Sequence, residues 1–346
     1  MIFSYNFLQS FFKEKLPAPE KLGELLMLHF FEVEEVVKKE NDYAIDIDIL
    51  ASRAADCFSH IGIAREIAAI TGLEYKLEER KIKESKEELD DRVSVFVRDA
   101  CERYTLRGVD SVKVGPSPKY IQQILKTCNI NPINNIVDIT NYVMLETGQP
   151  LHAFDAEKLE GEKIIVRYSK KREKIVTLDE KRYDLQENIL VIADELSPVG
   201  IAGIKGGVVP EVDENTKTIY IEAGNFDSLI IRRGSRELKL RTDASLRFEH
   251  GIPLELTEIA ANRAASMMAE VAKGDVLKGL IDYRAKDYIE REIEFSIEDL
   301  RKVLGVEVPL KETERILRSL EFGVKRDGSK FLTLLWFDLQ IVVLLF

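Results

Sequence analysis

The chain has 346 residues, of which 45% are hydrophobic and 32% charged, and its formal net charge is −11 at pH 7. This length predicts two or three domains, and the composition is that of a soluble globular protein. The net charge argues against a general binder of polyanions. No apolar run reaches the roughly 18–20 residues of a membrane-spanning helix. The first residues lack a signal-like pattern, so we expect a cytoplasmic protein without membrane contacts.

Cysteine and basic residues restrict the site types further. The three cysteines are far apart and form no CxxC pair, which predicts reduced free thiols and no structural zinc site. Basic residues are concentrated in two places, 170–172 and 232–241. Such a charge run is usually a solvated face, so any nucleic acid would be bound by a local patch.

Residues 1–76 are predicted to form a small α/β domain. Apolar spacing predicts a helix over Pro19–His29, and a serine cap predicts a second helix over 59–70. Two strands are expected between them, over 31–37 and 43–50. The second alternates apolar and acidic residues, as a half-exposed strand does.

The charged stretch 77–92 is expected to be a linker or an exposed helix, followed by a central domain over 93–285. In this domain "NNIVDITNYVMLETG" has a helical apolar face over 135–147 that Gly148 would end. Strand-like and helix-like segments follow one another without strict alternation, which predicts an α+β fold. The expected strands are 92–97, 163–169, 173–178, 189–194 and 217–223, and the other expected helices open at Ser117 or span 227–238 and 254–271.

A third unit is expected over 291–346. Two short segments that each end in glycine predict a helix pair, and we expect a small helical, winged-helix-like module. The residues 331–346 are almost all apolar and would need a covering partner. The predicted fold class is therefore a multidomain α+β chain. Its central mixed α/β domain is flanked by a small N-terminal α/β unit and a C-terminal helical module.

Two familiar motifs are not supported by their context. "SHIGIA" (59–64) is similar to the His-Ile-Gly start of a nucleotide signature, but no lysine-rich partner loop accompanies it. "GIAGIKGG" (200–207) lacks the GxxxxGK[ST] and GxGxxG spacings, so it predicts a tight turn rather than a triphosphate loop. A nucleophile elbow and an HExxH motif are also absent from the sequence.

A set of polar and small residues remains, spread over the central domain. Each has an ordinary explanation: His152 as a structural histidine after a helix, Glu222 as an exposed carboxylate at a strand end, Ala244 as helix packing. They would form a site only if the fold brings them together, which spacing alone does not establish. The set is Thr140, Asn141, His152, Ala202, Gly203, Glu222 and Ala244.

Three long stretches carry a resemblance to a known family. They are "NNIVDITNYVMLETGQPLHAFDAEKL" (134–159), "GIAGIKGG" (200–207) and "IEAGNFDSLIIRRGSRELKLRTDASLRFEHGI" (221–252). They resemble the central editing domain in the β-subunit family of phenylalanyl-tRNA synthetases, of the bacterial type. Residues 1–76 are similar to that family's N-terminal domain, and 291–346 to the start of its next helical domain.

The resemblance implies a pocket that hydrolyses tyrosine wrongly attached to tRNA(Phe). It places Thr140, Asn141 and His152 at the ester, where they position water without a Ser-His-Asp triad. It places Glu222 at the ring hydroxyl of tyrosine, since a buried acceptor favours a substrate that carries the hydroxyl. Small residues would leave room for the amino acid and the terminal ribose: Ala202, Gly203 and Ala244.

The resemblance also implies partners and cofactors. An α subunit would hold ATP and Mg²⁺ and carry out aminoacylation of tRNA(Phe), and none of this chemistry is evident on this chain alone. The basic helix around Arg232, Arg233 and Arg236 would contact tRNA phosphates. Asp338 matches the first acidic ligand of a metal site in the family, but Leu344 stands where the next acid belongs.

The sequence departs from the family pattern in four ways. One is that "ASRAADC" (51–57) stands where the family usually has an Asn-Arg-Pro turn. The inserted oligonucleotide-binding fold is absent, Lys205 replaces a usual methionine, and the chain is expected to be truncated at its C-terminal side. Three interpretations stay open: a β subunit or fragment that acts with an α subunit, a free-standing hydrolase of Tyr-tRNA(Phe), and a non-catalytic RNA-binding paralogue or gene fragment.

Overall fold

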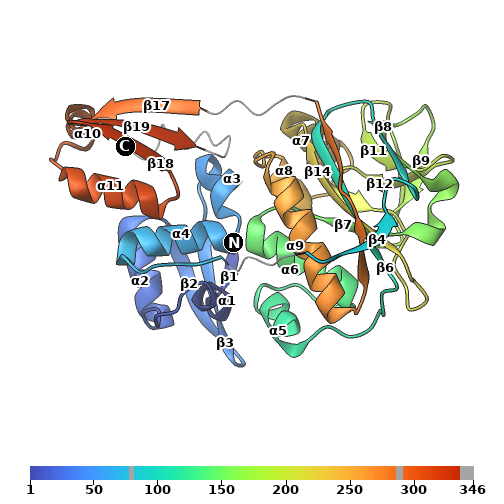
Figure 1. Ribbon diagram of the computed structural model, residues 1–346, viewed down its shortest axis with the longest axis horizontal. Helices are drawn as coiled ribbons and strands as arrows, with labels where there is room; N and C mark the ends of the chain where they lie inside the picture. Colours follow the sequence, from blue (N-terminus) through green and yellow to red (C-terminus); the bar gives the residue numbers. More distant parts are fainter. Residues whose placement is uncertain (78–81, 286–290, 336–346) are drawn as a thin grey trace. The chain divides into compact units, whose positions relative to one another are not determined.

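A computed structural model describes residues 1–77, 82–285 and 291–335 and divides the chain into two compact units (Figure 1). The first unit comprises Met1–Glu78, Thr127–Asn129 and Tyr288–Phe346, and the second comprises Glu79–Lys126 and Ile130–Asp287. Among the described residues, no helix is long and apolar enough to cross a bilayer.

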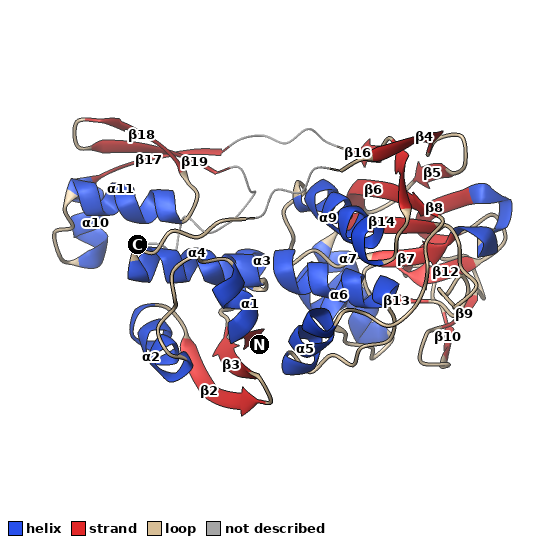
Figure 2. Ribbon diagram, turned by 60° about the horizontal axis from the view of Figure 1, so that its bottom comes forward, coloured by secondary structure: helices blue, strands red, loops and turns tan. Residues whose placement is uncertain are grey.

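The N-terminal part of the first unit is a three-stranded antiparallel sheet with helices packed on it (Figure 2). The strand order is β1-β3-β2, and the buried Ile45 and Ile47 of β3 lie on its helix-covered side. Ser59 accepts a hydrogen bond from the backbone N–H of Gly62 and so caps α4, as its position in the sequence predicts. The elements are β1 (Ile2–Ser4), α1 (Tyr5–Ser10), α2 (Pro19–His29), β2 (Glu32–Lys39), β3 (Asp42–Asp48), η1 (Ala51–Arg53), α3 (Ala54–Cys57) and α4 (His60–Thr71).

The C-terminal part of the first unit is mixed α/β rather than helical. The two predicted helices are present as α10 (Ile297–Leu304) and α11 (Leu310–Ser319), and each begins and ends near the expected residues. A three-stranded sheet of order β17-β19-β18 accompanies them. Its strands are β17 (Arg291–Ser296), β18 (Gly323–Asp327) and β19 (Lys330–Leu335). The apolar segment after residue 335 lies outside the described residues.

Helix α11 packs on α4, so sequence segments that we expected to be separate belong to one compact unit. Arg315 donates to the backbone carbonyl of Ala69 at 3.0 Å. Arg65 forms an ion pair with Glu321 at 2.8 Å. These bonds join the two ends of the described chain across the whole intervening second unit.

The second unit contains two sheets with a shared hydrophobic core. One has the order β4-β15-β6-β14-β7, with β16 also paired to β6, and the other has the order β13-β12-β11-β8-β5. The first sheet contains β4 (Glu84–Glu88), β6 (Cys101–Asp110), β7 (His152–Asp155), β14 (Ile219–Phe226), β15 (Asp275–Lys278) and β16 (Ile281–Arg284). The second contains β5 (Ser94–Val97), β8 (Lys163–Tyr168), β11 (Leu190–Ala193), β12 (Pro198–Ile201) and β13 (Lys205–Gly206), and a separate hairpin is formed by β9 (Lys174–Val176) and β10 (Arg182–Asp184).

Five α-helices complete the described part of the second unit. Helix α6 matches its predicted bounds because Asn134 caps its first turn and Gly148, at φ +88°, ends it in the left-handed conformation. Helix α9 packs on β6 and β14. The helices are α5 (Lys119–Thr127), α6 (Asn135–Thr147), α7 (Ser228–Glu237), α8 (Asp243–Phe248) and α9 (Leu256–Val271), with short 3₁₀ turns η2 (Ala156–Lys158) and η3 (Glu160–Glu162).

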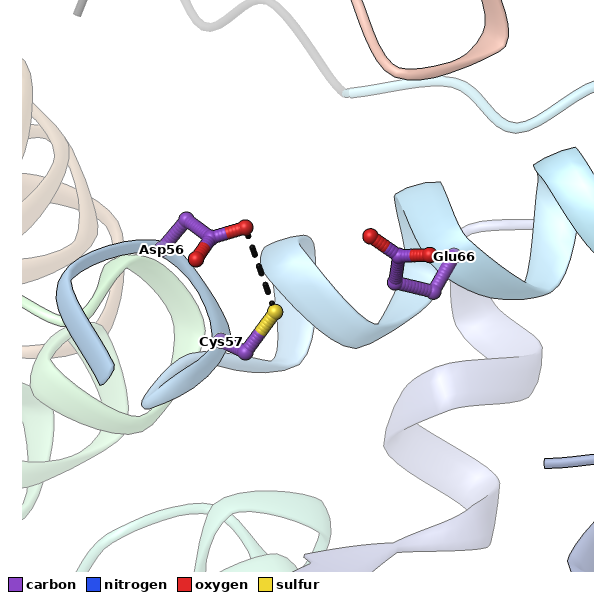
Figure 3. Close-up of side chains that lie close together, drawn as sticks. All are labelled: Asp56, Cys57 and Glu66. Atoms are coloured by element: carbon purple, nitrogen blue, oxygen red, sulfur yellow. Dashed lines mark hydrogen bonds between the residues drawn. The ribbon is translucent and has the colours of Figure 1, made fainter. Parts of the chain in front are cut away.

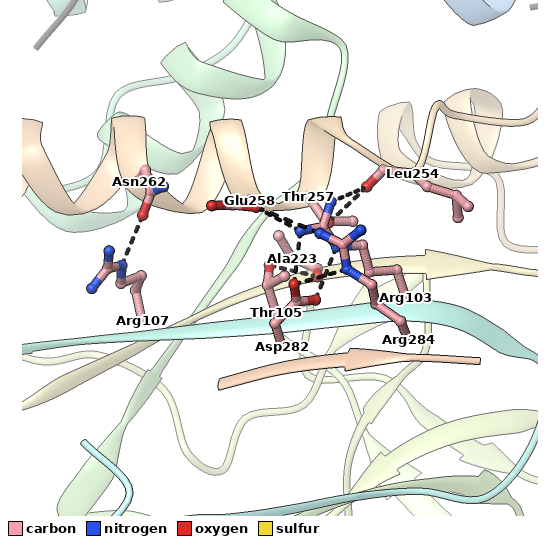
Figure 4. A network of polar contacts seen from close by, with 10 residues as sticks. All are labelled: Arg103, Thr105, Arg107, Ala223, Leu254, Thr257, Glu258, Asn262, Asp282 and Arg284. Carbon is pink, nitrogen blue, oxygen red and sulfur yellow. Dashed lines mark hydrogen bonds and ion pairs between the residues drawn. The ribbon is translucent and has the colours of Figure 1, made fainter. Parts of the chain in front are cut away.

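The fold differs from the sequence-based expectation around β4 and β6. Residues 77–92, expected to be a linker or exposed helix, contain β4, which pairs in parallel with β15. Strand β6 escaped notice because one of its faces carries arginines. Arg103 is buried against α9 and β16, where it bonds to Asp282 at 2.9 Å and Glu258 at 2.7 Å (Figure 4). Arginine in a sequence normally predicts an exposed strand position, so a strand with a buried, paired arginine is not recognised as a core strand.

Candidate active site

A cavity of about 90 Å³ lies in the second unit, beside β7, β12–β13, β14 and α8. This volume is several times the roughly 10–15 Å³ that one water molecule occupies by the same measure. Its wall is largely apolar, and its polar groups come from three side chains, His152, Lys205 and Glu222. Apolar side chains lining it include Phe154, Ile192, Ile201, Phe226 and Phe248.

His152 and Glu222 are brought together by strand pairing. They are directly opposite one another on β7 and β14, so their side chains leave the same face of the sheet. His152 therefore begins a strand and does not stand on an isolated corner, and Glu222 lies within a buried strand instead of at an exposed end. This pairing is the geometric reason that two residues 70 positions apart in sequence share one cavity.

The imidazole of His152 is half-buried, and its Nε2 atom is inaccessible to solvent. It packs edge-on against Phe154 with ring centroids 4.6 Å apart. A Cβ on Gly206 would lie only 2.4 Å from its Cε1, so the ring rests directly on that glycine. Among the described residues its Nε2 has no hydrogen-bond partner. Burial lowers the pKa of His152 to about 4, which keeps the ring neutral at physiological pH.

The carboxyl of Glu222 is also buried, with 7% of its surface exposed. Its Oε2 accepts a hydrogen bond from the hydroxyl of Tyr104 at 3.0 Å. Burial raises the pKa of Glu222 to about 7, and the Tyr104 bond opposes that rise. The group is therefore divided between its two protonation states near neutral pH.

The glycine-rich segment forms a tight turn at the cavity wall, as its sequence predicts. Gly203 has φ +65°, and a Cβ there would lie 3.0 Å from atoms of Ile231 and Phe248. These glycines therefore face apolar side chains and an imidazole ring rather than a phosphate. Lys205 lines the cavity, but its Nζ is bound to Asp179 at 3.0 Å. The lysine charge is neutralised within the unit.

Ala202, Gly203 and Ala244 all line the same cavity as His152 and Glu222. Helix α8 carries Ala244 and is tied to the turn by Thr242, whose Oγ1 donates to the carbonyl of Ile204 at 2.8 Å. The same threonine caps α8 in a reciprocal bond with Ser245.

The remaining predicted site residues are not in the cavity wall. Thr140 and Asn141 are on α6, and the Thr140 hydroxyl donates to the carbonyl of Val137 at 2.7 Å. The three arginines of α7 have exposed side chains outside the cavity: Arg232, Arg233 and Arg236. Asp338 lies outside the described residues.

Comparison with known proteins agrees with the predicted resemblance. Residues 100–273, half of the chain, match the model of the B3/4 domain. The chain belongs to the B3/4 domain family.

Members with curated names cover the chain widely. The phenylalanine–tRNA ligase beta subunit of Moorella thermoacetica is 44% identical over 289 residues, or 83% of this chain and 36% of that protein. That of Carboxydothermus hydrogenoformans is 40% identical over 91% of this chain and 38% of that protein. The chain thus spans well under half the length of these relatives. The predicted resemblance to this β-subunit family is confirmed.

A solved structure shows the same fold. It is an N-terminal fragment of the phenylalanyl-tRNA synthetase beta subunit from Pyrococcus horikoshii, with a TM-score of 0.50 and 16% identity over 96% of this chain and 92% of that chain. At this identity the similarity establishes the multidomain α+β fold alone.

Sequence reasoning missed the groups that surround His152 and Glu222 in this cavity. Tyr104 is fully buried on β6, and Phe226 and Phe248 line the cavity. The available signal was the alternation in the middle of β6, where Tyr104 and Leu106 alternate with Arg103, Thr105 and Arg107. The sequence alone gives Tyr104 the appearance of ordinary core packing, because it does not show that the Glu222 carboxyl lies diagonally across the strand pair.

A cluster of potential metal-ligating side chains lies in the first unit. Ligand atoms of Asp56, Cys57 and Glu66 lie within 4.8 Å of one another (Figure 3). Nη2 of Arg53 lies 2.6 Å from Asp56 Oδ2 and 2.5 Å from Glu66 Oε1. A guanidinium therefore already supplies the positive charge, and a metal ion would have to displace it. The cluster is an ion-pair network and not a metal centre.

Proposed function

We propose that the chain is the β subunit, or the N-terminal part, of a phenylalanine–tRNA ligase, and that its cavity hydrolyses Tyr-tRNA(Phe). The observation that supports this proposal is the buried Glu222 carboxyl beside the neutral imidazole of His152 in a largely apolar cavity. Such a cavity favours an aromatic side chain that bears one hydrogen-bond donor.

Selectivity follows from the cost of an unpaired polar group. The ring hydroxyl of tyrosine would donate to Glu222 and compensate its buried carboxylate. A phenylalanine ring would exclude water from the same carboxylate without replacing the bond, which costs roughly 1–3 kcal/mol or more for a charged acceptor. Recognition of a present hydroxyl is a stronger discriminator than rejection of an added one.

Hydrolysis needs a water molecule and a positioned ester. Water attacks the ester carbonyl, the bond to the ribose oxygen breaks, and tyrosine and a free terminal hydroxyl are released. His152, neutral and with an unused Nε2, is placed to orient the water or the ester. Thr140 and Asn141 would act from α6, although they do not line the cavity. Ala202, Gly203 and Ala244 would leave space for the amino acid and the terminal ribose.

ATP and Mg²⁺ do not fit the described residues of this chain. Its glycine-rich turn is filled by apolar side chains, and the one cluster of potential metal ligands is occupied by Arg53. We therefore assign phenylalanine activation to an α subunit that would bind both. tRNA(Phe) would meet the exposed α7 arginines through its phosphates.

A free-standing hydrolase is the second candidate. One observation favours it: all the residues that line the cavity belong to the second compact unit. A site built within one unit does not need a partner to complete it. Activity of the chain without an α subunit would support this candidate.

Deacylation by the purified chain tests the proposal. The expected result is faster release of tyrosine from Tyr-tRNA(Phe) than of phenylalanine from Phe-tRNA(Phe). Glu222→Ala should lower this preference by about 10- to 100-fold, as loss of a bond to a charged acceptor predicts. Glu214→Ala, at an exposed glutamate of the same unit, is the matched control and should leave the preference unchanged. If folded protein releases neither amino acid with or without an α subunit, the chain is an RNA-binding relative without this activity.

A further inference from the structure

Tyr104 is the one side chain that holds the Glu222 carboxyl among the described residues. Its hydroxyl lies 3.0 Å from Glu222 Oε2. The other oxygen, Oε1, has no hydrogen-bond partner within the described chain. Tyr104 is fully buried and does not line the cavity, whereas Glu222 does. Any effect of Tyr104 on a bound molecule must therefore pass through Glu222.

The strand register fixes this contact. On β14 and β6, Glu222 is opposite Leu106 and Gly224 is opposite Tyr104. Glu222 and Tyr104 are thus diagonal neighbours on the same face, within reach of a long side chain. Gly224 leaves the position opposite Tyr104 without a side chain, and a Cβ there would lie 2.3 Å from Phe226 Cζ. The ring of Phe226 fills that space and closes the cavity beside Glu222.

We propose that Tyr104 is a positioning residue: it holds one oxygen of Glu222 in place and leaves the other to accept a hydrogen bond from the ring hydroxyl of the substrate. This inference rests on the proposed function and names a further determinant of its specificity. An unheld carboxyl could rotate and present either oxygen, whereas a held one offers a single acceptor in a fixed direction.

The same bond favours the charged form of Glu222. Burial raises the pKa of this carboxyl to about 7, and the Tyr104 hydroxyl opposes the rise. The other ionisable groups nearby are Cys101 on β6, His152 on β7 and Lys205 on β13, and Lys205 is already paired with Asp179. On α8, Arg247 and Asp243 lie 4.0 Å apart and pair with each other. Removal of the Tyr104 hydroxyl should thus raise the pKa of Glu222 further.

Tyr104→Phe tests the proposal because it removes only the hydroxyl. If the pKa of Glu222 rises by about one unit, the ionised fraction at pH 7 falls about fivefold, but at pH 8.5 by less than about 1.5-fold. The preference for Tyr-tRNA(Phe) over Phe-tRNA(Phe) should follow the same pattern between pH 6 and 8.5. A purely structural role for Tyr104 would reduce the preference equally at every pH.

A double-mutant cycle shows whether Tyr104 acts through Glu222. In a Glu222→Gln background the further change Tyr104→Phe should alter the preference less than twofold, because the group that it positions is gone. An unchanged effect of Tyr104→Phe in that background would overturn the proposal.

A readout that needs no hydrolysis separates this inference from the proposed function. In full-length chain labelled with ¹³C at glutamate carboxyls, the resonance that Glu222→Gln removes identifies Glu222. Its titration midpoint should rise in Tyr104→Phe. An equal midpoint in the two proteins would overturn the positioning role even if the chain deacylates Tyr-tRNA(Phe). A raised midpoint in a chain that never deacylates would keep the Tyr104–Glu222 coupling and refute the editing function.

Discussion

In the described part of each compact unit, one buried glutamate has a pKa that burial raises to about 7: Glu66 in the first and Glu222 in the second. Their surroundings are different. Arg53 binds Glu66 at 2.5 Å and also binds Asp56, while stacking its guanidinium on Phe30 with 4.8 Å to the ring centroid. Glu222 has only the neutral hydroxyl of Tyr104, and it borders a cavity. A raised glutamate pKa therefore indicates burial alone. Whether the carboxyl can bind a ligand depends on the side chain that it already contacts.

The largest expected effect concerns the ion-pair network. Arg53→Met would leave the carboxyls of Asp56 and Glu66 buried without their cation, which costs about 3–5 kcal/mol of unfolding free energy. Hydrogen exchange by mass spectrometry can read α4 for the first unit and β14 for the second. Protection should fall in α4 while β14 changes little. Unchanged protection in α4 would show that Arg53 is dispensable and would break the comparison.

Glu222→Gln should stabilise the second unit, increasingly at higher pH. The folded pKa of Glu222 lies above its unfolded value, so its contribution to stability is intact below about pH 4.5 and is lost as pH rises through 7. Glutamine does not titrate, so the gain over the parent chain should grow by about 2–3 kcal/mol from pH 5 to pH 8. Pulse hydrogen exchange of β14 across a urea series at both pH values measures this gain. A gain independent of pH would mean that Glu222 does not titrate in this window; Glu214→Gln is the exposed control.

Gly206→Ala should displace the imidazole that rests on Gly206. The added Cβ would lie 2.4 Å from His152 Cε1, so the ring must move, and such a displacement typically costs 10- to 100-fold in rate. Deacylation of Tyr-tRNA(Phe) under single-turnover conditions checks this. Gly200→Ala in the same segment is a matched control, because its nearest atoms would be 3.8 Å away and the rate should change less than about twofold. Equal rates for the two variants would show that the position of the His152 ring does not affect deacylation.

The smallest effect is expected at Lys205. Because its charge is bound to Asp179, Lys205→Met should change the deacylation rate and the tyrosine preference by less than about threefold. A change of tenfold or more would mean that the charge of Lys205 acts in the cavity. Glu222 would then have a charged neighbour, as Glu66 has, and the contrast between the two glutamates would be lost.

Local signals predicted the helices well. The bounds of α2 and α6 agree with the sequence because proline, asparagine and glycine at helix ends act on their own neighbours. The module at 291–335 was only half predicted: both helices were expected, and α10 does end at Gly305, but the three short strands were not. Strand β6 was missed because the partners of Arg103 lie more than 150 residues away.

The site shows the same division between local and distant information. Residue types and their resemblance to a known family singled out His152, Glu222, Ala202, Gly203 and Ala244, and the structure places all five in one cavity. The sequence did not reveal that Tyr104 holds Glu222 or that Asp179 binds Lys205. Thr140 and Asn141 were grouped with the cavity residues, although they lie outside its wall.

The sequence by itself determined where helices start and stop, which residues have the chemistry for a site, and which family the chain resembles, because each of these is written in near neighbours or in residue identity. The tertiary structure decided the protonation of Glu222 and His152, the neutralisation of Lys205, and the identity of the residue behind the carboxyl. These depend on burial and on strand register between segments far apart in the chain, and desolvation acts on a group only when the fold has closed around it.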